Sequence, residues 1–551
     1  MSESSKKLKV FLPLLFSIVL ALGIFLGFKL RDSQAPRNTY FLNTGTHGAL
    51  QEILDLTKLK YVDSINTRDL KNDAIQGILG HLDPHSVYIP ADQLASVNED
   101  LEGSFQGIGV EFLIIRDTIN ITSVIPGGPS ATAGLEIGDK LVKVNDSVVA
   151  GVHITTDRIK TLLRGPLNSN VRLVIYREKD TSTFTVKRGT IPLHSVDAAY
   201  MMAPGVGYIR INRFASNTYQ EFMDAMLALQ RQGLKKLVID LRQNSGGYLD
   251  AAVHIADELL SDHKLIVYTE GKHYPRKDYN CEKAGVFEQG SLAILVDGGT
   301  ASASEILSGA VQDWDRGTII GRRTFGKGLV QEQYNLSDGG AMRLTVARYF
   351  IPSGRCIQRP YRNGSTAYYD DIIDRYLHGE LTHADSIHFA DTTKYYTKIK
   401  HRPEYGGGGI MPDIFVPIDT VRLDKVMSSL YAGSAFFDFA YGYYDAHRDE
   451  FSHYQHVEDF VTQYEVSDKL LSAFRAFAEA RGISVPPKAV ERDKKEISLR
   501  IKALLAREIW QLPGYYRVLN TGDRAVDSAL KVLNEAEMPL TKEARHGSGA
   551  S

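Results

Sequence analysis

Apolar runs typical of buried strands alternate with helical runs between residues 205 and 350, and this alternation constrains the fold more than any other feature. Strand-like runs at Leu237–Leu241, Leu265–Tyr268 and Leu292–Val296 are interleaved with helical runs at Ala251–Leu260 and Ser302–Gln312. Buried strands that alternate with helices build a mostly parallel sheet covered by helices. This part of the chain is therefore predicted to be an α/β domain.

The regions on either side have a different character. Residues 46–102 and 426–540 carry apolar residues at helical spacing. Residues 103–190 contain clustered glycines and short β-rich runs, which predict a small β-rich domain. Residues 361–425 are rich in Tyr, His, Gly and Asp and look like a long surface excursion, and the tail 541–551 is predicted to be disordered. The expected class is multidomain α+β.

The N-terminus predicts a membrane anchor. Three lysines (Lys6, Lys7 and Lys9) precede an uncharged apolar run over residues 10–28, whose length approaches the ~20 residues that span a bilayer. These lysines favour a cytoplasmic segment 1–9, so everything beyond the linker 29–45 would face a non-cytoplasmic space. Basic residues after the run weaken this orientation. A cleaved signal peptide is the alternative, although no small-x-small cleavage site ends the run.

Charge and cysteine content exclude several classes of protein. The chain has 64 basic and 66 acidic residues, a net charge of −2, so no basic excess points to nucleic acid. Its two cysteines, Cys281 and Cys356, are interpreted as free thiols, with one disulfide as the alternative. His81, Asp83 and His85 resemble metal ligands, but the proline between them prevents one regular helix from presenting both histidines. No metal is predicted.

A strand, a glycine turn and a helix start follow one another in VDGGTASASEI (residues 296–306). A serine at a helix start lies among free N–H groups, and the helix dipole favours negative charge there. Ser302 or Ser304 could therefore be a nucleophile, or simply cap the helix.

A lysine between two glycines lies in TFGKGLVQ (residues 324–331). Its neighbours are apolar, and a desolvated lysine loses its proton more easily and can act as a general base. Lys327 is therefore a candidate base. Phosphate binding is the alternative, but a P-loop needs Ser or Thr where Gly328 stands.

Paired glycines end the segment DLRQNSGG (residues 240–247) after another buried strand. Glycines let backbone N–H groups approach a substrate closely, so the loop could donate to an oxyanion. Alone it is only a turn, and it lacks the GxGxxG of a dinucleotide site.

Together these three segments resemble the C-terminal processing peptidases, the tail-specific Ser/Lys-dyad proteases of family S41. The resemblance covers roughly residues 46–425 and includes LDPHS at residues 82–86, which supports a structural role for His85. Ser245 stands where many members have proline. The resemblance implies a protease core over residues 191–425 with a crotonase/ClpP-like fold.

The resemblance also implies the roles of individual residues. Ser302 matches the nucleophile and Lys327, 25 positions later, matches the base. Gln331 matches the residue that orients the lysine, which i, i+4 geometry would allow if the segment were helical. The implied oxyanion donors are Ala303 and one of Gly246 and Gly247. No cofactor is implied.

The β-rich segment 103–190 resembles a PDZ domain. Gly107, Ile108, Gly109 and Val110 match the loop and strand that receive a peptide C-terminus, with backbone amides gripping the carboxylate. In the family this domain can also gate the active site. An alternative is that the domain only stabilises the N-terminal region.

The expected function is an extracytoplasmic serine endopeptidase, anchored in the inner membrane with its catalytic part in the periplasm. Its expected partners are protein substrates with free apolar C-termini, a second copy bound through the helical ends, and an adaptor protein. The alternatives are a catalytically silent or ligand-binding member of the same scaffold, and a PDZ scaffold or chaperone.

Overall fold

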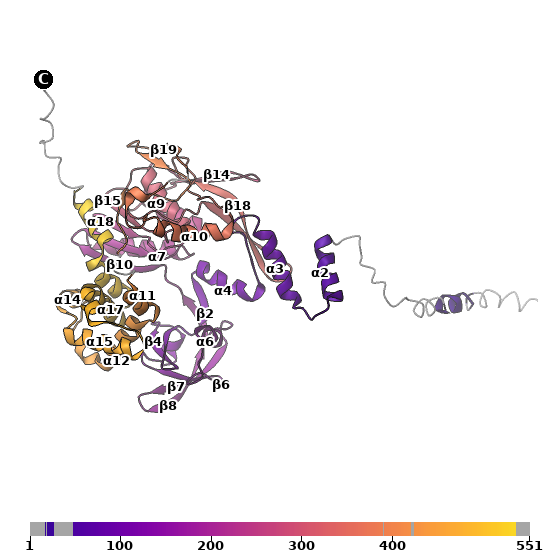
Figure 1. Ribbon diagram of the computed structural model, residues 1–551, viewed down its shortest axis with the longest axis horizontal. Helices are drawn as coiled ribbons and strands as arrows, with labels where there is room; N and C mark the ends of the chain where they lie inside the picture. The colour runs from indigo at the N-terminus through magenta and orange to yellow at the C-terminus, as the bar shows by residue number, and fades with distance from the viewer. Residues whose placement is uncertain (1–16, 18, 27–47, 389–390, 420–423, 536–551) are drawn as a thin grey trace, which may run out of the picture. The chain divides into compact units, whose positions relative to one another are not determined.

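The structure is a computed structural model that describes residue 17 and residues 19–26, 48–388, 391–419 and 424–535 (Figure 1). The chain divides into two compact units, residues 1–77 and 78–551. The expected cytoplasmic segment, the linker, the disordered tail and most of the expected anchor lie outside the described residues. Within the described part of the chain, no helix is both long and apolar enough to cross a membrane.

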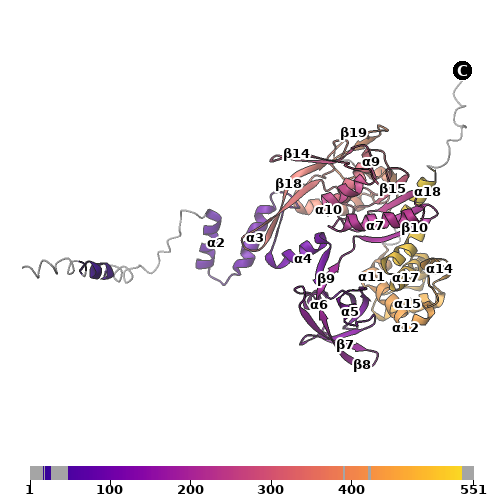
Figure 2. The same cartoon turned by 180° about the vertical axis from the view of Figure 1, so that it is seen from behind.

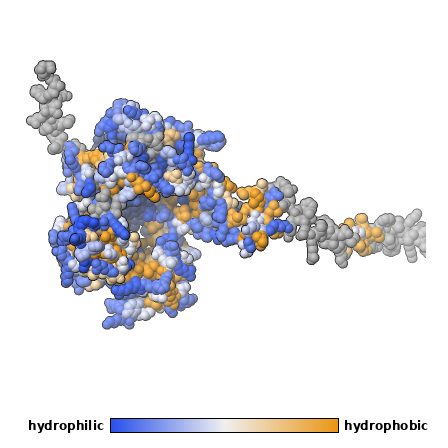
Figure 3. All heavy atoms as spheres, viewed as in Figure 1, coloured by the Kyte–Doolittle hydropathy of each residue, from blue (hydrophilic) through white to orange (hydrophobic). Residues whose placement is uncertain are grey.

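The described part of the first unit is helical, as the spacing predicts. It contains α2 (Ala49–Lys60) and the start of α3 (Thr67–Leu79). No residue of α2 is buried, and Leu50, Ile53 and other apolar side chains of this helix are open to solvent (Figure 3). The positive charges of Lys58 and Lys60 in its last turn interact favourably with the helix dipole.

A six-stranded sheet organises the second unit. Its first two strands are antiparallel and all later pairs are parallel, as the strand–helix alternation predicts. Across the sheet the order is β10 (Val196–Ala203), β11 (Val206–Ile211), β12 (Lys236–Asp240), β15 (Ser291–Val296), β16 (Thr318–Gly321) and β21 (Ile414–Phe415). Every residue of β12 is buried, because helices cover both faces.

The two faces of this sheet are covered by helices from distant parts of the chain. On one face α7 (Thr218–Arg231), α8 (Leu249–Asp257) and α9 (Ala303–Asp313) share the larger apolar core with the strands. On the other face α18 (Arg524–Glu535) packs on β15 and β16 through Val526, Ala529 and Leu533. The end of the expected C-terminal helical region is thus part of the core of the α/β domain.

The residues that follow Lys327 belong to a second sheet. Its order is β1 (Val87–Ile89), β18 (Ala341–Phe350), β13 (Leu265–Gly271) and β14 (Tyr274–Asn280), with β17 (Leu329–Asn335) also paired with β18. Strand β17 starts two residues after Lys327. The i, i+4 helical geometry suggested for Lys327 and Gln331 is therefore wrong, because Gln331 lies on a strand.

The predicted β-rich domain folds around its own core of Ile, Leu and Val side chains. Its sheet has the order β3 (Val110–Ile115), β4 (Thr118–Val124), β5 (Lys140–Val144), β7 (Asn170–Arg177) and β8 (Asp180–Lys187), with β6 (Ser147–Val148) on β5. It also contains α5 (Pro129–Thr132) and α6 (Thr156–Leu163). The antiparallel pair β2 (Ser104–Gly107) and β9 (Gly189–Pro192) joins the ends of this domain, next to α4 (Ala91–Glu102) (Figure 2).

The surface excursion predicted over residues 361–425 is exposed over much of its length, but it is built from regular elements. This stretch contains α10 (Gly364–Leu377), η1 (Ala384–Ser386), β19 (Lys394–Tyr396), β20 (Pro403–Tyr405) and the strand β21 of the main sheet. Many of its polar residues are exposed, but Arg375 is only 4% exposed, pairs with Asp371, and donates to the carbonyl of Thr324 beside the lysine loop. A charged residue of this stretch is thus buried where an ion pair compensates its charge.

The C-terminal helical module has a separate core rich in aromatic residues. It comprises α11 (Lys425–Ala432), α12 (Ala435–Ala446), α13 (Arg448–Phe451), α14 (Val457–Gln463), α15 (Asp468–Ala480), α16 (Pro487–Arg492) and α17 (Lys494–Leu519), followed by η3 (Asn520–Gly522). Helix α17 is interrupted at Trp510 and Gln511, just before Pro513, which cannot donate a helical hydrogen bond.

Candidate active site

The buried strand β15 leads through a turn into Ser302, the N-cap residue of helix α9. Ser302 has φ +56° and ψ −117°, a backbone conformation that L side chains rarely adopt. Such strain persists where the surroundings over-determine it and is frequent at nucleophiles. Ser304 is fully buried and donates its hydroxyl to the Asn244 carbonyl, so the geometry leaves Ser302 as the serine that faces the cleft.

Lys327 lies in the loop between β16 and β17, and its ammonium group is largely withdrawn from water. Burial lowers the pKa of Lys327 to about 8; Glu305 opposes this shift and Arg343 adds to it. The loop is tightly packed, since a Cβ on Gly328 would lie 2.9 Å from the backbone nitrogen of Gln358. A lysine with a pKa near 8 is neutral in about a tenth of molecules at pH 7, which suits a general base.

A single buried carboxylate connects the two candidate catalytic residues. The side chain of Glu305 accepts the N–H groups of Ser302 (2.8 Å) and Lys327 (2.9 Å) on one oxygen. Its other oxygen accepts the Gly326 N–H (2.8 Å) and the Thr324 hydroxyl. Burial raises the pKa of Glu305 to about 7, while these four hydrogen bonds oppose the shift. Sequence reasoning missed this residue, although S-x-x-E at a helix start is a recognisable capping pattern.

The loop 240–247 approaches the nucleophile turn through Asn244. The main-chain carbonyl of Asn244 accepts the Ala301 N–H. The side-chain amide of Asn244 donates to the Ile211 carbonyl, and its side-chain oxygen accepts the Gly246 N–H at 2.9 Å. A Cβ on Gly246 would lie 2.7 Å from the Cβ of Ser302, so only glycine fits this contact. Because the Gly246 N–H is already used, Gly247 is the better of the two predicted donors.

A buried ion cluster fixes the start of this loop. Burial alone would raise the pKa of Asp240, but the guanidinium groups of Arg242 and Arg210 outweigh it and hold that pKa well below its usual range. Arg242 also donates to Asp523, which precedes α18, at 2.7 Å. The C-terminal end of the chain is thereby linked to the loop that follows β12.

The predicted partner of the lysine has different contacts. Gln331 lies on strand β17 and lines the cleft, but its amide donates to the Thr345 hydroxyl at 3.2 Å. That hydroxyl in turn donates to Asp83. The described contacts of Gln331 therefore lead to the LDPHS segment, and its effect on Lys327 stays a prediction.

The LDPHS segment forms a turn near the lysine loop. The Asp83 carboxylate accepts the N–H groups of His85 and Ser86 and the Ser86 hydroxyl. The His85 ring contacts the Tyr368 hydroxyl at 3.0 Å; burial, aided by Lys327, lowers the His85 pKa to about 4. Over the described part of the chain no cluster of His, Cys, Asp or Glu fits a metal ion. Cys281 and Cys356 are free thiols, as interpreted from the sequence.

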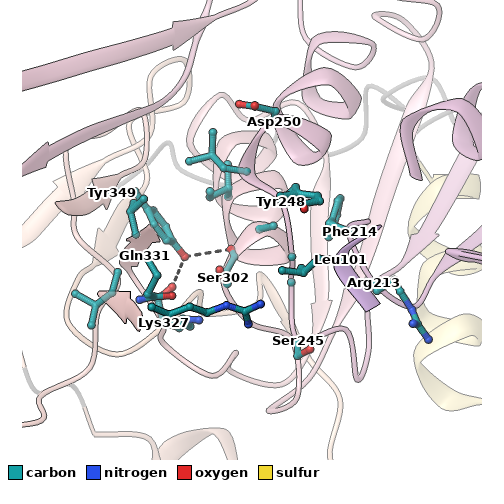
Figure 4. Close-up of a pocket in the computed structure, with 18 of the residues that line it drawn as sticks. Leu101, Arg213, Phe214, Ser245, Tyr248, Asp250, Ser302, Lys327, Gln331 and Tyr349 are labelled. Atoms are coloured by element: carbon teal, nitrogen blue, oxygen red, sulfur yellow. Dashed lines mark hydrogen bonds between the residues drawn. The ribbon is translucent and has the colours of Figure 1, made fainter. Parts of the chain in front are cut away.

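A cleft of about 800 Å³ brings the predicted catalytic residues together (Figure 4). Its lining includes every residue that the sequence assigned to catalysis: Ser302, Lys327, Gln331, Ala303, Gly246 and Gly247. Apolar side chains including Phe214, Leu249 and Ile306 also line it, with Arg213 and Asp250 toward its edges. Such a mixture of apolar walls and a few polar groups is typical of ligand-binding clefts.

The four residues predicted to hold a peptide C-terminus lie at an open edge of the sheet of the β-rich domain. Strand β3 pairs only with β4 among the described strands, so its other edge is available to a further strand. Gly109 has φ +76° and its carbonyl accepts the Ile125 N–H, while the buried Ile108 accepts from Ser130. Gly107 ends β2 and Val110 begins β3, so the chain turns sharply between the strands.

Comparison with known proteins identifies the family. Profiles of peptidase family S41, of a PDZ domain and of a family of unknown function (DUF8443) match residues 205–363, 121–177 and 426–511. A probable CtpA-like serine protease of Staphylococcus aureus is 35% identical over 321 residues, 57% of this chain and 64% of the relative. A carboxy-terminal-processing protease of Bartonella bacilliformis is 33% identical over 313 residues, 56% of this chain and 71% of the relative.

Solved structures are also similar to parts of this chain. A photosystem II D1 C-terminal processing protease is 28% identical, with a TM-score of 0.35 and coverage of 68% of this chain and 88% of that one. The chain spans just under two thirds of the length of the staphylococcal relative. It belongs to peptidase family S41, the family that its sequence motifs resemble. The PDZ domain and the multidomain α+β class predicted from the sequence are confirmed.

Proposed function

We propose that the chain is a serine endopeptidase that cleaves peptide bonds with the dyad Ser302 and Lys327. One observation carries the proposal: a strained serine and a desolvated lysine line the same cleft, and the same buried carboxylate, Glu305, accepts the backbone N–H groups of both. A scaffold that had lost catalysis would have no need to hold both residues in this way.

The mechanism follows from these positions. Neutral Lys327 takes the proton of the Ser302 hydroxyl as the Oγ atom bonds to the substrate carbonyl carbon. The resulting oxyanion accepts hydrogen bonds from Ala303, the first residue of α9, and from Gly247. The C–N bond then breaks as protonated Lys327 gives its proton to the leaving amine. Water attacks the acyl-enzyme and loses its proton to Lys327. The ester bond then breaks as Lys327 returns that proton to the Ser302 oxygen, which restores both residues.

In this proposal the PDZ domain selects the substrate. A peptide can add as a strand to the open edge of β3, with its terminal carboxylate at the turn between Gly107 and Val110. In this mode the domain binds the terminal carboxylate and one apolar side chain of the peptide. It therefore selects unfolded proteins with free apolar C-termini.

The proposal is tested by digesting one unfolded protein that carries either an apolar or a charged C-terminal tail. The wild type is expected to cleave both, with the apolar tail lowering KM on the order of tenfold, since each 1.4 kcal/mol of tail binding is tenfold. Ile108→Asp, which places a charge in the buried apolar core of the PDZ domain, should lose this difference and keep its rate on the charged tail. Equal KM values for both tails in the wild type would contradict tail recognition.

The alternatives predict other outcomes in the same assay. A catalytically silent or ligand-binding member would bind the tail and cleave neither substrate. A PDZ scaffold or chaperone would keep its full cellular function after Ser302→Ala. Formation of a homodimer through the helical ends and the need for an adaptor protein stay predictions.

We further propose that the enzyme is anchored in the inner membrane with its catalytic part in the periplasm. The support is the sequence of residues 1–28, in which lysines precede a long uncharged run. In fractionated cells the full chain is expected in the membrane fraction, and protease added outside the inner membrane should digest the domains beyond residue 48. Recovery of the intact chain in the cytoplasmic fraction would contradict this placement.

A further inference from the structure

The hydroxyl of one buried tyrosine lies between the main chains of the two dyad residues. The Tyr349 oxygen is 3.1 Å from the Ser302 carbonyl oxygen and also contacts the Lys327 carbonyl oxygen. Figure 4 shows both contacts as dashed lines that converge on this hydroxyl. A phenol has a single proton, so the two carbonyls share one donor.

Tyr349 is itself held rigidly. It lies on β18 opposite Thr269 of β13, and its N–H donates to the Gly328 carbonyl at 3.0 Å. The side chain is 1% exposed and its ring belongs to the large apolar core. Its hydroxyl therefore has little freedom to move away from the two carbonyls.

The contacts of Tyr349 complement those of Glu305. Glu305 accepts the N–H groups of Ser302 and Lys327, whereas Tyr349 donates to their carbonyls. Each dyad residue is thus held on both sides of its Cα. This double constraint explains how Ser302 keeps a backbone conformation that costs free energy of order 1–3 kcal/mol.

We propose that Tyr349 is a positioning residue whose hydroxyl fixes the separation of Ser302 and Lys327. The inference rests on the proposed dyad mechanism and adds a residue to it. Tyr349 takes no part in proton transfer, because burial raises its pKa well above the usual range and keeps it a neutral donor. Loss of the hydroxyl should let the lysine loop and the nucleophile turn drift apart.

The test is Tyr349→Phe, which removes only the hydroxyl and keeps the ring. Since a misplacement of about 1 Å can cost 10²-fold, we expect kcat to fall 10- to 100-fold. KM should change less than twofold. The rate constant for labelling by a fluorophosphonate should fall by the same factor as kcat. That rate constant reports only on folded molecules, so partial unfolding would lower the labelled fraction and leave the rate constant interpretable.

A matched control is Tyr88→Phe. Tyr88 is also buried in this sheet, on β1, and its hydroxyl donates to Asp338 rather than to the dyad. The control should label at the wild-type rate. Labelling of Tyr349→Phe at the wild-type rate would overturn the positioning role. An unlabelled, inactive wild type would instead overturn the dyad proposal, and the positioning role with it.

Discussion

Lys327→Met is expected to lower kcat on an unfolded protein substrate by a factor on the order of 10⁴–10⁶, the range found when a serine protease loses one member of its catalytic triad. Methionine fills the space of the lysine stem but cannot take the Ser302 proton. The midpoint of thermal unfolding should stay the same or rise, because the substitution removes a cation that burial disfavours. The measurement is kcat beside the thermal unfolding curve.

The pH dependence of the wild type belongs to the same prediction. Only neutral Lys327 accepts a proton, and its pKa is lowered to about 8. Below pH 8, kcat/KM should therefore rise about tenfold per pH unit, and above pH 8 it should level off. Lys264→Met, which removes a lysine that contacts Ser261 and Asp262 away from the cleft, should retain this profile. A wild-type profile flat from pH 6 to 9 would contradict Lys327 as the base.

Glu305→Gln should have the second largest effect. Each carboxylate oxygen of Glu305 accepts hydrogen bonds from two donors. In glutamine an NH₂ group replaces one of these oxygens, and this group cannot accept the hydrogen bonds of the two donors that face it. Leaving two buried donors unsatisfied costs about 2–6 kcal/mol, at about 1–3 kcal/mol each. We expect the free energy of unfolding to fall by that amount and kcat per folded molecule to fall 10²- to 10³-fold.

Glu508→Gln provides the matched control for Glu305. Burial also raises the pKa of Glu508 to about 7, but this residue lies on α17 in the helical module and does not line the cleft. Unfolding in urea gives the stability of both variants, and titration with a labelling inhibitor gives the folded fraction. If both variants lost the same stability and neither lost activity, Glu305 would have no special part in holding the dyad.

Much of the fold and site could be predicted from the sequence because the signals are local. A buried strand, a glycine turn and a helix start identify Ser302 within a few residues, and apolar neighbours mark Lys327 as desolvated. Period-two and helical spacing likewise predict the elements that carry them. The family resemblance chose between Ser302 and Ser304, and the buried hydrogen bond of Ser304 now gives the physical reason.

The remaining features depend on contacts between distant residues. Strand β17 forms because it pairs with β18, and the polar residues after Val330 give no local signal of a strand. Tyr349 reaches Ser302 from 47 positions along the chain. The Gly246 N–H is withdrawn from catalysis by the side chain of Asn244, which no spacing rule predicts. The burial of Arg375 depends on its ion pair with Asp371, and composition alone does not predict such a pair.

The most direct test of the dyad is to locate a fluorophosphonate adduct by mass spectrometry of the digested protein. We predict one adduct in the wild type, on Ser302, and at the same pH and time almost none in Lys327→Met. Full labelling of Lys327→Met on Ser302, or an adduct on another serine that survives Ser302→Ala, would contradict catalysis by Ser302 and Lys327.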